Sequence, residues 1–179
     1  MGRTKGDLVF DGESLAERAT QALWPFCGSV LISIRPGSSN PVPACAAIED
    51  AEPAGRGPLA GIDAAFAATG SADLLVLACD YPLVDSNFFR QLTAHGDDDG
   101  DLLLPTDGKG RDHPLVALWR RSCQPIVHEA LEEGRYEVRE LFPDLEIRRL
   151  QQADLPGLEL DSMLTNVNWP ADWEQLKSP

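Results

Sequence analysis

The chain has 179 residues, the usual size of a single domain with one hydrophobic core. Its 29 acidic and 15 basic residues give a formal charge of -14, so electrostatic repulsion would oppose nonspecific binding to nucleic acid or anionic lipid. We therefore expect no nucleic-acid and no membrane partner, and the 43% hydrophobic content indicates a globular rather than a disordered chain.

Helical and strand patterns alternate along the chain. Apolar residues at three- and four-residue spacing predict helices over residues 14–24, 59–69, 86–95 and 122–133. Short runs rich in leucine, isoleucine and valine predict strands at residues 29–34, 46–48, 74–78, 102–104, 115–119 and 147–150. The alternation predicts one α/β domain over residues 1–179, with a doubly wound, mainly parallel sheet and helices on both faces. A short closing helix is expected after Pro170.

No stretch reaches the roughly 18 uncharged apolar residues of a membrane span, and we expect a soluble cytoplasmic protein. The four cysteines form no Cys-x-x-Cys pair and have no neighbouring histidine. This spacing predicts reduced thiols rather than a zinc site or disulfides.

Ligands of open α/β sheets bind beyond the carboxyl ends of the strands, where Asp50, Asp80 and Thr106 are expected. Asp80 follows the most apolar strand, and a carboxylate there needs a cation or several hydrogen-bond donors to offset its desolvation. Mg²⁺ is the favoured partner. The alternative is a helix N-cap, but Asp85 or Ser86 is better placed for that role.

The glycine-rich stretch at residues 55–61 opens the second predicted helix. It has neither the Gly-x-Gly-x-x-Gly spacing nor a Gly-Lys-Ser/Thr triplet, so a phosphate loop and a simple tight turn, with Pro58 at the first helical position, both stay open. The acidic run at residues 97–101 lacks the glycine and glutamate of a calcium loop and predicts a solvated turn.

The three histidines are too scattered along the sequence to indicate a catalytic triad. His113 stands out because Arg-Asp-His-Pro, at residues 111–114, directly precedes an apolar strand. A binding segment and a structural turn closed by an Arg–Asp pair are equally compatible with this pattern.

Short motifs follow one another in a fixed order: Met-Gly-Arg-Thr-Lys at 1–5, Gly-Pro-Leu-Ala-Gly at 57–61, Cys-Asp-Tyr-Pro at 79–82, Arg-Asp-His-Pro at 111–114 and Asn-Val-Asn-Trp-Pro at 166–170. Over the whole chain they resemble the MobA-like nucleotidyltransferases, specifically the molybdenum cofactor guanylyltransferases, whose fold is Rossmann-like. The Gly-Pro-Leu-Ala-Gly form favours guanylyl over cytidylyl transfer. Such proteins often carry an asparagine near the end of the second strand that contacts the base, whereas this chain has Ile32, Ser33 and Ile34 there.

The resemblance implies transfer of GMP from GTP to molybdopterin, with release of pyrophosphate and Mg²⁺ as cofactor. It assigns Asp80 to the metal and Lys5 to the triphosphate as the catalytic pair, and both residues to nucleotide binding. Asp50 and Gly57 complete the nucleotide site. The pterin and its phosphate are assigned to Arg111, His113, Asn166 and Asn168. Transient partners that deliver the molybdenum cofactor are also suggested.

The resemblance also implies a first strand and a glycine-rich loop, which would lie upstream of Met1. We therefore expect the natural gene product to extend upstream, unless another segment fills the slot that this strand would occupy. The alternative functions are a cytidylyl or sugar-nucleotidyl transferase of the same fold and a noncatalytic relative that binds nucleotide or pterin.

Overall fold

The computed structural model describes residues 5–50, 57–70, 72–97 and 100–167. In chain order the elements are η1 (Lys5–Asp7), β1 (Val9–Phe10), β2 (Glu13–Ser14), α1 (Leu15–Leu23), η2 (Trp24–Phe26), β3 (Leu31–Ile34), β4 (Ala46–Glu49), α2 (Pro58–Thr69), β5 (Leu74–Leu77), α3 (Ser86–Ala94), β6 (Leu102–Pro105), β7 (Val116–Trp119), α4 (Cys123–Glu132), η3 (Val138–Asp144), β8 (Ile147–Leu150) and α5 (Leu160–Met163). The predicted strands and helices within this part of the chain are confirmed, whereas the helix expected after Pro170 lies outside it.

The largest sheet has four strands in the order β5-β7-β6-β8. Strand β8 is parallel to β6, and β7 is antiparallel to both of its neighbours, so β5 and β6 point the same way. Strands β3 and β4 form a separate parallel pair. The α/β fold class is confirmed, and the antiparallel β7 is a detail that the apolar runs did not reveal. Its direction brings the residues before β7 to the same edge as the carboxyl ends of β5 and β6.

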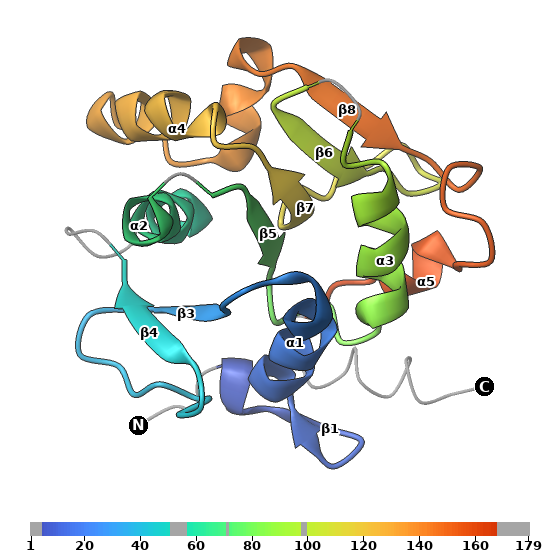
Figure 1. Cartoon of the computed structure of the whole chain (residues 1–179), viewed down its shortest axis with the longest axis horizontal. Helices are drawn as coiled ribbons and strands as arrows, with labels where there is room; N and C mark the ends of the chain where they lie inside the picture. The colour runs from blue at the N-terminus through green and yellow to red at the C-terminus, as the bar shows by residue number, and fades with distance from the viewer. Residues whose placement is uncertain (1–4, 51–56, 71, 98–99, 168–179) are drawn as a thin grey trace.

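Helices cover both faces of the four-stranded sheet, as Figure 1 shows. Leu103 of β6 faces the core that α1 and α3 cover, whereas its neighbours Leu102 and Leu104 face the core that α2 and α4 cover. This two-residue period follows from the pleat of a strand. Burial from both sides explains why the central strands carry no polar residue.

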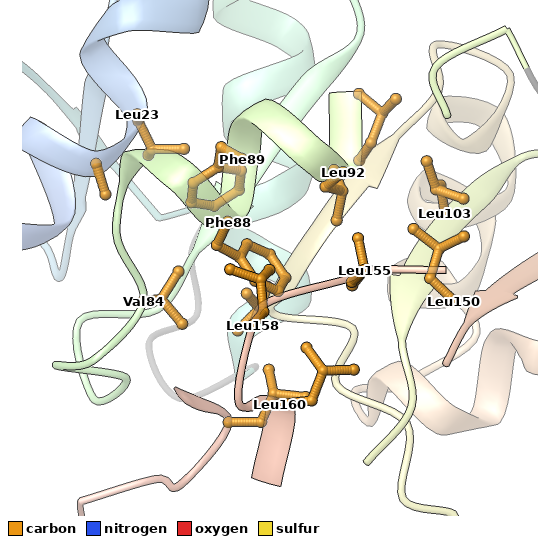
Figure 2. Packing of buried hydrophobic residues seen from close by; sticks show 14 of the residues in the cluster. Leu23, Val84, Phe88, Phe89, Leu92, Leu103, Leu150, Leu155, Leu158 and Leu160 are labelled. Carbon is orange, nitrogen blue, oxygen red and sulfur yellow. The ribbon is translucent and has the colours of Figure 1, made fainter. Parts of the chain in front are cut away.

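The core under α3 is completed by the last part of the described chain. Figure 2 shows Phe88, Phe89 and Leu92 of α3 gathered with Leu155 and with further leucines after β8. The four named side chains are fully buried. Burial of one such side chain stabilises the fold by about 1.5–3 kcal/mol, so this core fixes the position of the segment that leads to Asn166.

Local sequence sets where the helices begin. Ser14 and Glu17 form a capping box at the start of α1, and the Asp85 side chain accepts a hydrogen bond from the backbone N–H of Phe88 at 3.0 Å. The predicted cap of α3 is thus confirmed, so Asp80 is not needed for that role. Pro58 is the first residue of α2, after Gly57 with a φ of 69°.

Strands β3 and β5 each have one partner in the described chain, β4 and β7 respectively. Helix α2 packs against β3, β4 and β5 and so connects the two sheets (Figure 1). The β1–β2 hairpin, η3 and α5 are elements that the sequence patterns did not predict. The four cysteines are free, with no disulfide among them in the described residues. No helix in these residues has the length and apolar character to cross a membrane.

Candidate functional site

The site lies at one edge of the four-stranded sheet. Asp80 follows β5, Asp107 follows β6, and His113 precedes the antiparallel β7, so the strand directions bring all three to this edge. A single bridge between Thr106 and Asp112 closes the loop between β6 and β7. The edge is the one at which ligands of open α/β sheets bind.

Asp80 is held by the segment that follows α5. The side-chain amide of Asn166 donates to Asp80 Oδ2 at 2.9 Å, and the backbone N–H of Val167 donates to the Asp80 carbonyl oxygen at 2.8 Å. The other amide atom, Asn166 Oδ1, is buried without a hydrogen-bond partner in the described residues. A carboxylate and an unsatisfied buried amide oxygen therefore belong to one side-chain pair.

This donor set fits Mg²⁺, which prefers oxygen ligands and is commonly bound through one or two carboxylates together with substrate phosphates. The described residues contain no group of three or more histidine, cysteine, aspartate or glutamate side chains arranged for a metal. This part of the chain therefore contains no metal site made of such protein ligands alone. A cation shared with substrate phosphates is compatible with Asp80 and Asn166.

Tyr81 connects this pair to His113. The Tyr81 hydroxyl lies 3.2 Å from His113 Nδ1, and the two rings meet edge to face at a centroid distance of 5.8 Å. Burial, reinforced by the charge of Asp80, raises the pKa of Tyr81. The phenol therefore stays protonated at neutral pH. The Asp107 carboxylate, 3.5 Å from His113 Nε2, favours the tautomer of a neutral His113 with its proton on Nε2, and in that tautomer the Tyr81 hydroxyl donates to Nδ1.

His113 is 7% exposed, and burial lowers its pKa although the nearby Asp107 acts to raise it. Its Nε2 lies 3.5 Å from Asp107 Oδ2 and has no hydrogen-bond partner in the described residues. His113 is therefore neutral at pH 7 and presents one N–H group.

Asp107 and Arg111 form the ion pair of this loop. Arg111 Nη2 lies 2.6 Å from Asp107 Oδ2, and the backbone N–H groups of Lys109 and Arg111 donate to Oδ1 at 2.9 and 2.8 Å. Burial acts to raise the pKa of Asp107, but these N–H donors and the guanidinium outweigh it and lower the pKa to about 2. The predicted Arg–Asp turn exists, with Asp107 rather than Asp112 as the partner of Arg111.

A second group surrounds the start of α2. The Ser33 hydroxyl donates to Asp50 Oδ1, and a Cβ on Gly61 would lie 2.5 Å from Ser33 Oγ and 3.2 Å from that carboxylate oxygen. A Cβ on Gly57 would lie 3.2 Å from the carbonyl oxygen of Tyr136. Glycine at both places lets α2 approach these polar atoms closely.

The structure joins Asp80 and Asn166 directly, and it connects them through Tyr81 and Asp107 to the remaining predicted pterin residues, His113 and Arg111. Asp50 and Gly57 belong to the second group. Lys5 is the first residue of η1, and Asn168 lies outside the described residues, as do the motif at 1–4 and residues 51–56. The roles assigned to all of these residues stay predictions.

Sequence reasoning did not single out Tyr81 and Asp107 as site residues. Tyr81 follows the singled-out Asp80, and Asp107 comes one residue after the strand-end Thr106. The same strand-end rule, extended by one position, would have found both.

The sequence profile of the "MobA-like NTP transferase domain" family matches residues 1–150. This chain belongs to that family. The match covers the strands, the Gly-Pro-Leu-Ala-Gly motif, Asp80 and the loop from Asp107 to His113.

Two relatives and one solved structure illustrate the similarity. A probable molybdenum cofactor guanylyltransferase of Carboxydothermus hydrogenoformans is 32% identical over 68% of this chain and 61% of its own. A probable molybdenum cofactor guanylyltransferase of Bacillus licheniformis is 29% identical over 98% of this chain and 89% of its own. The first alignment thus spans less than two thirds of that relative.

The structure of molybdopterin-guanine dinucleotide biosynthesis protein A from Archaeoglobus fulgidus superimposes with a TM-score of 0.77. The superposition covers 96% of this chain and 88% of the other at 21% identity. At this identity the likeness shows the shared fold, which is the Rossmann-like nucleotidyltransferase fold that the sequence predicted.

Proposed function

We propose that this nucleotidyltransferase transfers GMP from GTP to molybdopterin, with release of pyrophosphate. The observation that carries the proposal is the pairing of Asp80 with Asn166 at the sheet edge, beside the group formed by Tyr81, His113 and Arg111. The names of the two relatives support the choice of substrates. A cytoplasmic location and transient contact with proteins that deliver the molybdenum cofactor belong to the same proposal.

The reaction needs little covalent help from the protein. A phosphate oxygen of the acceptor forms a bond to the α-phosphorus of GTP, and the bond from that phosphorus to the pyrophosphate leaving group breaks. Alignment of the two groups and neutralisation of phosphate charge lower the barrier in such transfers. Mg²⁺, when bound by Asp80 and Asn166, supplies positive charge beside the phosphates.

Asp50 would accept hydrogen bonds from the nucleotide. The hydroxyl of Ser33 fixes the orientation of this carboxylate, and Gly61 leaves room for the pair. Lys5 would add a mobile point charge against the triphosphate, and Gly57 lets the start of α2 come close to it. This half of the site holds the donor of the transferred group.

His113, Arg111, Asn166 and Asn168 would receive the pterin and its phosphate. A buried neutral His113 offers an N–H donor without the cost of a buried charge. Arg111 is held in place by the buried Asp107 and offers its exposed guanidinium edge. Preorganised donors of this kind stabilise charge that develops during transfer.

The test is turnover of GTP with molybdopterin and Mg²⁺, measured as pyrophosphate release and dinucleotide formation. We expect GTP to be used in preference to CTP, and Asp80→Asn to lose transfer. Asp85→Asn is the matched control, because asparagine caps a helix as well as aspartate does and Asp85 lies on the α3 cap.

Absence of transfer by the parent under these conditions would refute the proposal. Preference for CTP would favour the cytidylyl alternative. Full turnover by Asp80→Asn would remove Asp80 from the metal site.

A further inference from the structure

Arg139 is an exposed arginine of η3 that the sequence motifs do not include. Its Nη2 lies 3.5 Å from the carbonyl oxygen of Asp112, the residue next to His113. Burial is the largest influence on the pKa of both Tyr81 and His113, and the charge of Arg139 acts to lower both pKa values. Arg139 is therefore close enough to act electrostatically on the centre of the site.

The segment that carries Arg139 reaches both halves of the site. At residue 136 its backbone carbonyl faces Gly57, at the start of α2, and at Arg139 it meets the backbone of Asp112. The guanidinium itself lies on the side of the group that contains His113, next to the backbone of Asp112.

The charge of Arg139 is not compensated by a carboxylate of the described residues, whereas neighbouring arginines are. Ion pairs of 2.6 to 2.9 Å join Arg111 to Asp107, Arg149 to Asp112, and Arg135 to both Glu133 and Asp144. In a chain with a formal charge of -14, an uncompensated guanidinium creates a local attraction for anions that the whole protein otherwise repels.

A second polar group beside it also needs a partner. His113 is more than nine-tenths buried, and its Nε2 makes no hydrogen bond within the described residues. Its nearest acceptor is Asp107 Oδ2 at 3.5 Å, an oxygen that Arg111 already holds at 2.6 Å. An N–H donor with so long a contact, next to two arginines, matches the oxygen atoms of a phosphate, because a buried donor that is poorly satisfied is unfavourable.

We propose that Arg139 binds the phosphate of the acceptor substrate, together with Arg111 and His113. This inference rests on the proposed function, and it adds a residue that positions the attacking phosphate. The acceptor is favoured over the triphosphate because Arg139 contacts the loop that carries His113, not the Ser33–Asp50 pair. A planar guanidinium suits this task, since two of its N–H groups can donate to one phosphate.

The kinetic test compares Arg139→Gln with Arg135→Gln, a control four residues earlier whose guanidinium is held by Glu133 and Asp144. A hydrogen bond to a charged group is worth about 1.5–3 kcal/mol, which corresponds to roughly 10- to 100-fold in KM. We expect this rise in the KM for molybdopterin in Arg139→Gln, with the KM for GTP within about two-fold of the parent. Arg139→Lys should recover part of the loss. Arg139→Gln and Arg135→Gln should both unfold at the parent temperature, because both arginine side chains reach the surface.

A binding test separates this inference from the proposed function. Inorganic phosphate is titrated into the parent, Arg139→Gln and Arg135→Gln, and binding is followed by NMR. This measurement requires no turnover. We expect weaker phosphate binding in Arg139→Gln alone. Equal phosphate binding in all three proteins, an unchanged KM for molybdopterin, or a rise confined to the KM for GTP would each overturn the assignment. A parent that binds phosphate through Arg139 yet transfers no GMP would refute only the proposed function.

Discussion

Gly61→Ala isolates the contribution of the Ser33–Asp50 pair to nucleotide binding. The added Cβ would lie 2.5 Å from Ser33 Oγ and 3.2 Å from both Ser33 Cβ and Asp50 Oδ1. The exposed hydroxyl of Ser33 can turn away from the new methyl group, but in doing so it breaks its hydrogen bond to Asp50. The substitution therefore acts on this pair before it acts on the backbone.

Two opposing terms set its effect on stability. Alanine in place of glycine inside a helix stabilises by about 0.5–1 kcal/mol, and loss of one hydrogen bond costs about 0.5–1.5 kcal/mol. The net change is then within about 1 kcal/mol, or roughly 2–4 °C in Tm for a chain of this length. Nucleotide affinity has no such compensation. A misplaced carboxylate loses a charge-assisted hydrogen bond, and we expect GTP to bind about ten-fold or more weakly.

The assay is a calorimetric titration with GTP and Mg²⁺, accompanied by thermal unfolding. Ser33→Ala should weaken GTP binding in the same direction, because it removes the hydroxyl without adding bulk. Gly28→Ala is the control, since a Cβ there meets nothing within 4 Å. If Gly61→Ala folds and binds GTP as tightly as the parent, the Ser33–Asp50 pair does not face the nucleotide.

Asp80→Asn should remain folded and unfold at or slightly above the parent temperature without ligand, because a desolvated charge is removed; a large drop in Tm would show a structural role instead. The pKa of Asp107 is lowered from 3.8 to about 2, so the stability from its ionised form is present above pH 4 and is lost as the pH falls toward 2. Over that range we expect the unfolding free energy of the parent to fall by about 2 kcal/mol more than that of Asp107→Asn, which denaturant titrations would measure; equal losses would contradict the low pKa.

The sequence alone predicted those parts of the fold in which the spacing of apolar residues reflects burial. The run from Leu74 to Leu77 alternates between two cores, and the capping of α3 by Asp85 follows from a short polar side chain at the helix start. Strand direction was not encoded locally. Strand β7 is as apolar as its neighbours, and only its hydrogen-bond partners show that it is antiparallel.

Strand ends and short motifs predicted part of the candidate site. Asp80 and His113 were found in this way. The partner of Arg111 was not, because the closure of the loop between β6 and β7 brings Asp107 rather than the adjacent Asp112 to the guanidinium. Arg139 lies in a 3-10 segment without apolar periodicity, and only the folded chain places it beside the site.

The separation of the β3–β4 pair from the four-stranded sheet has a consequence for exchange of backbone amide protons. Each sheet has its own hydrogen-bond ladder, and α2 packs against strands of both. Opening of the β3–β4 pair would expose Asp50 and its ladder without breaking a hydrogen bond between β5, β6, β7 and β8. The amides of β3 and β4 should therefore exchange with deuterium at a lower free energy than those of β6 and β7, and nucleotide binding should slow exchange first in the smaller ladder.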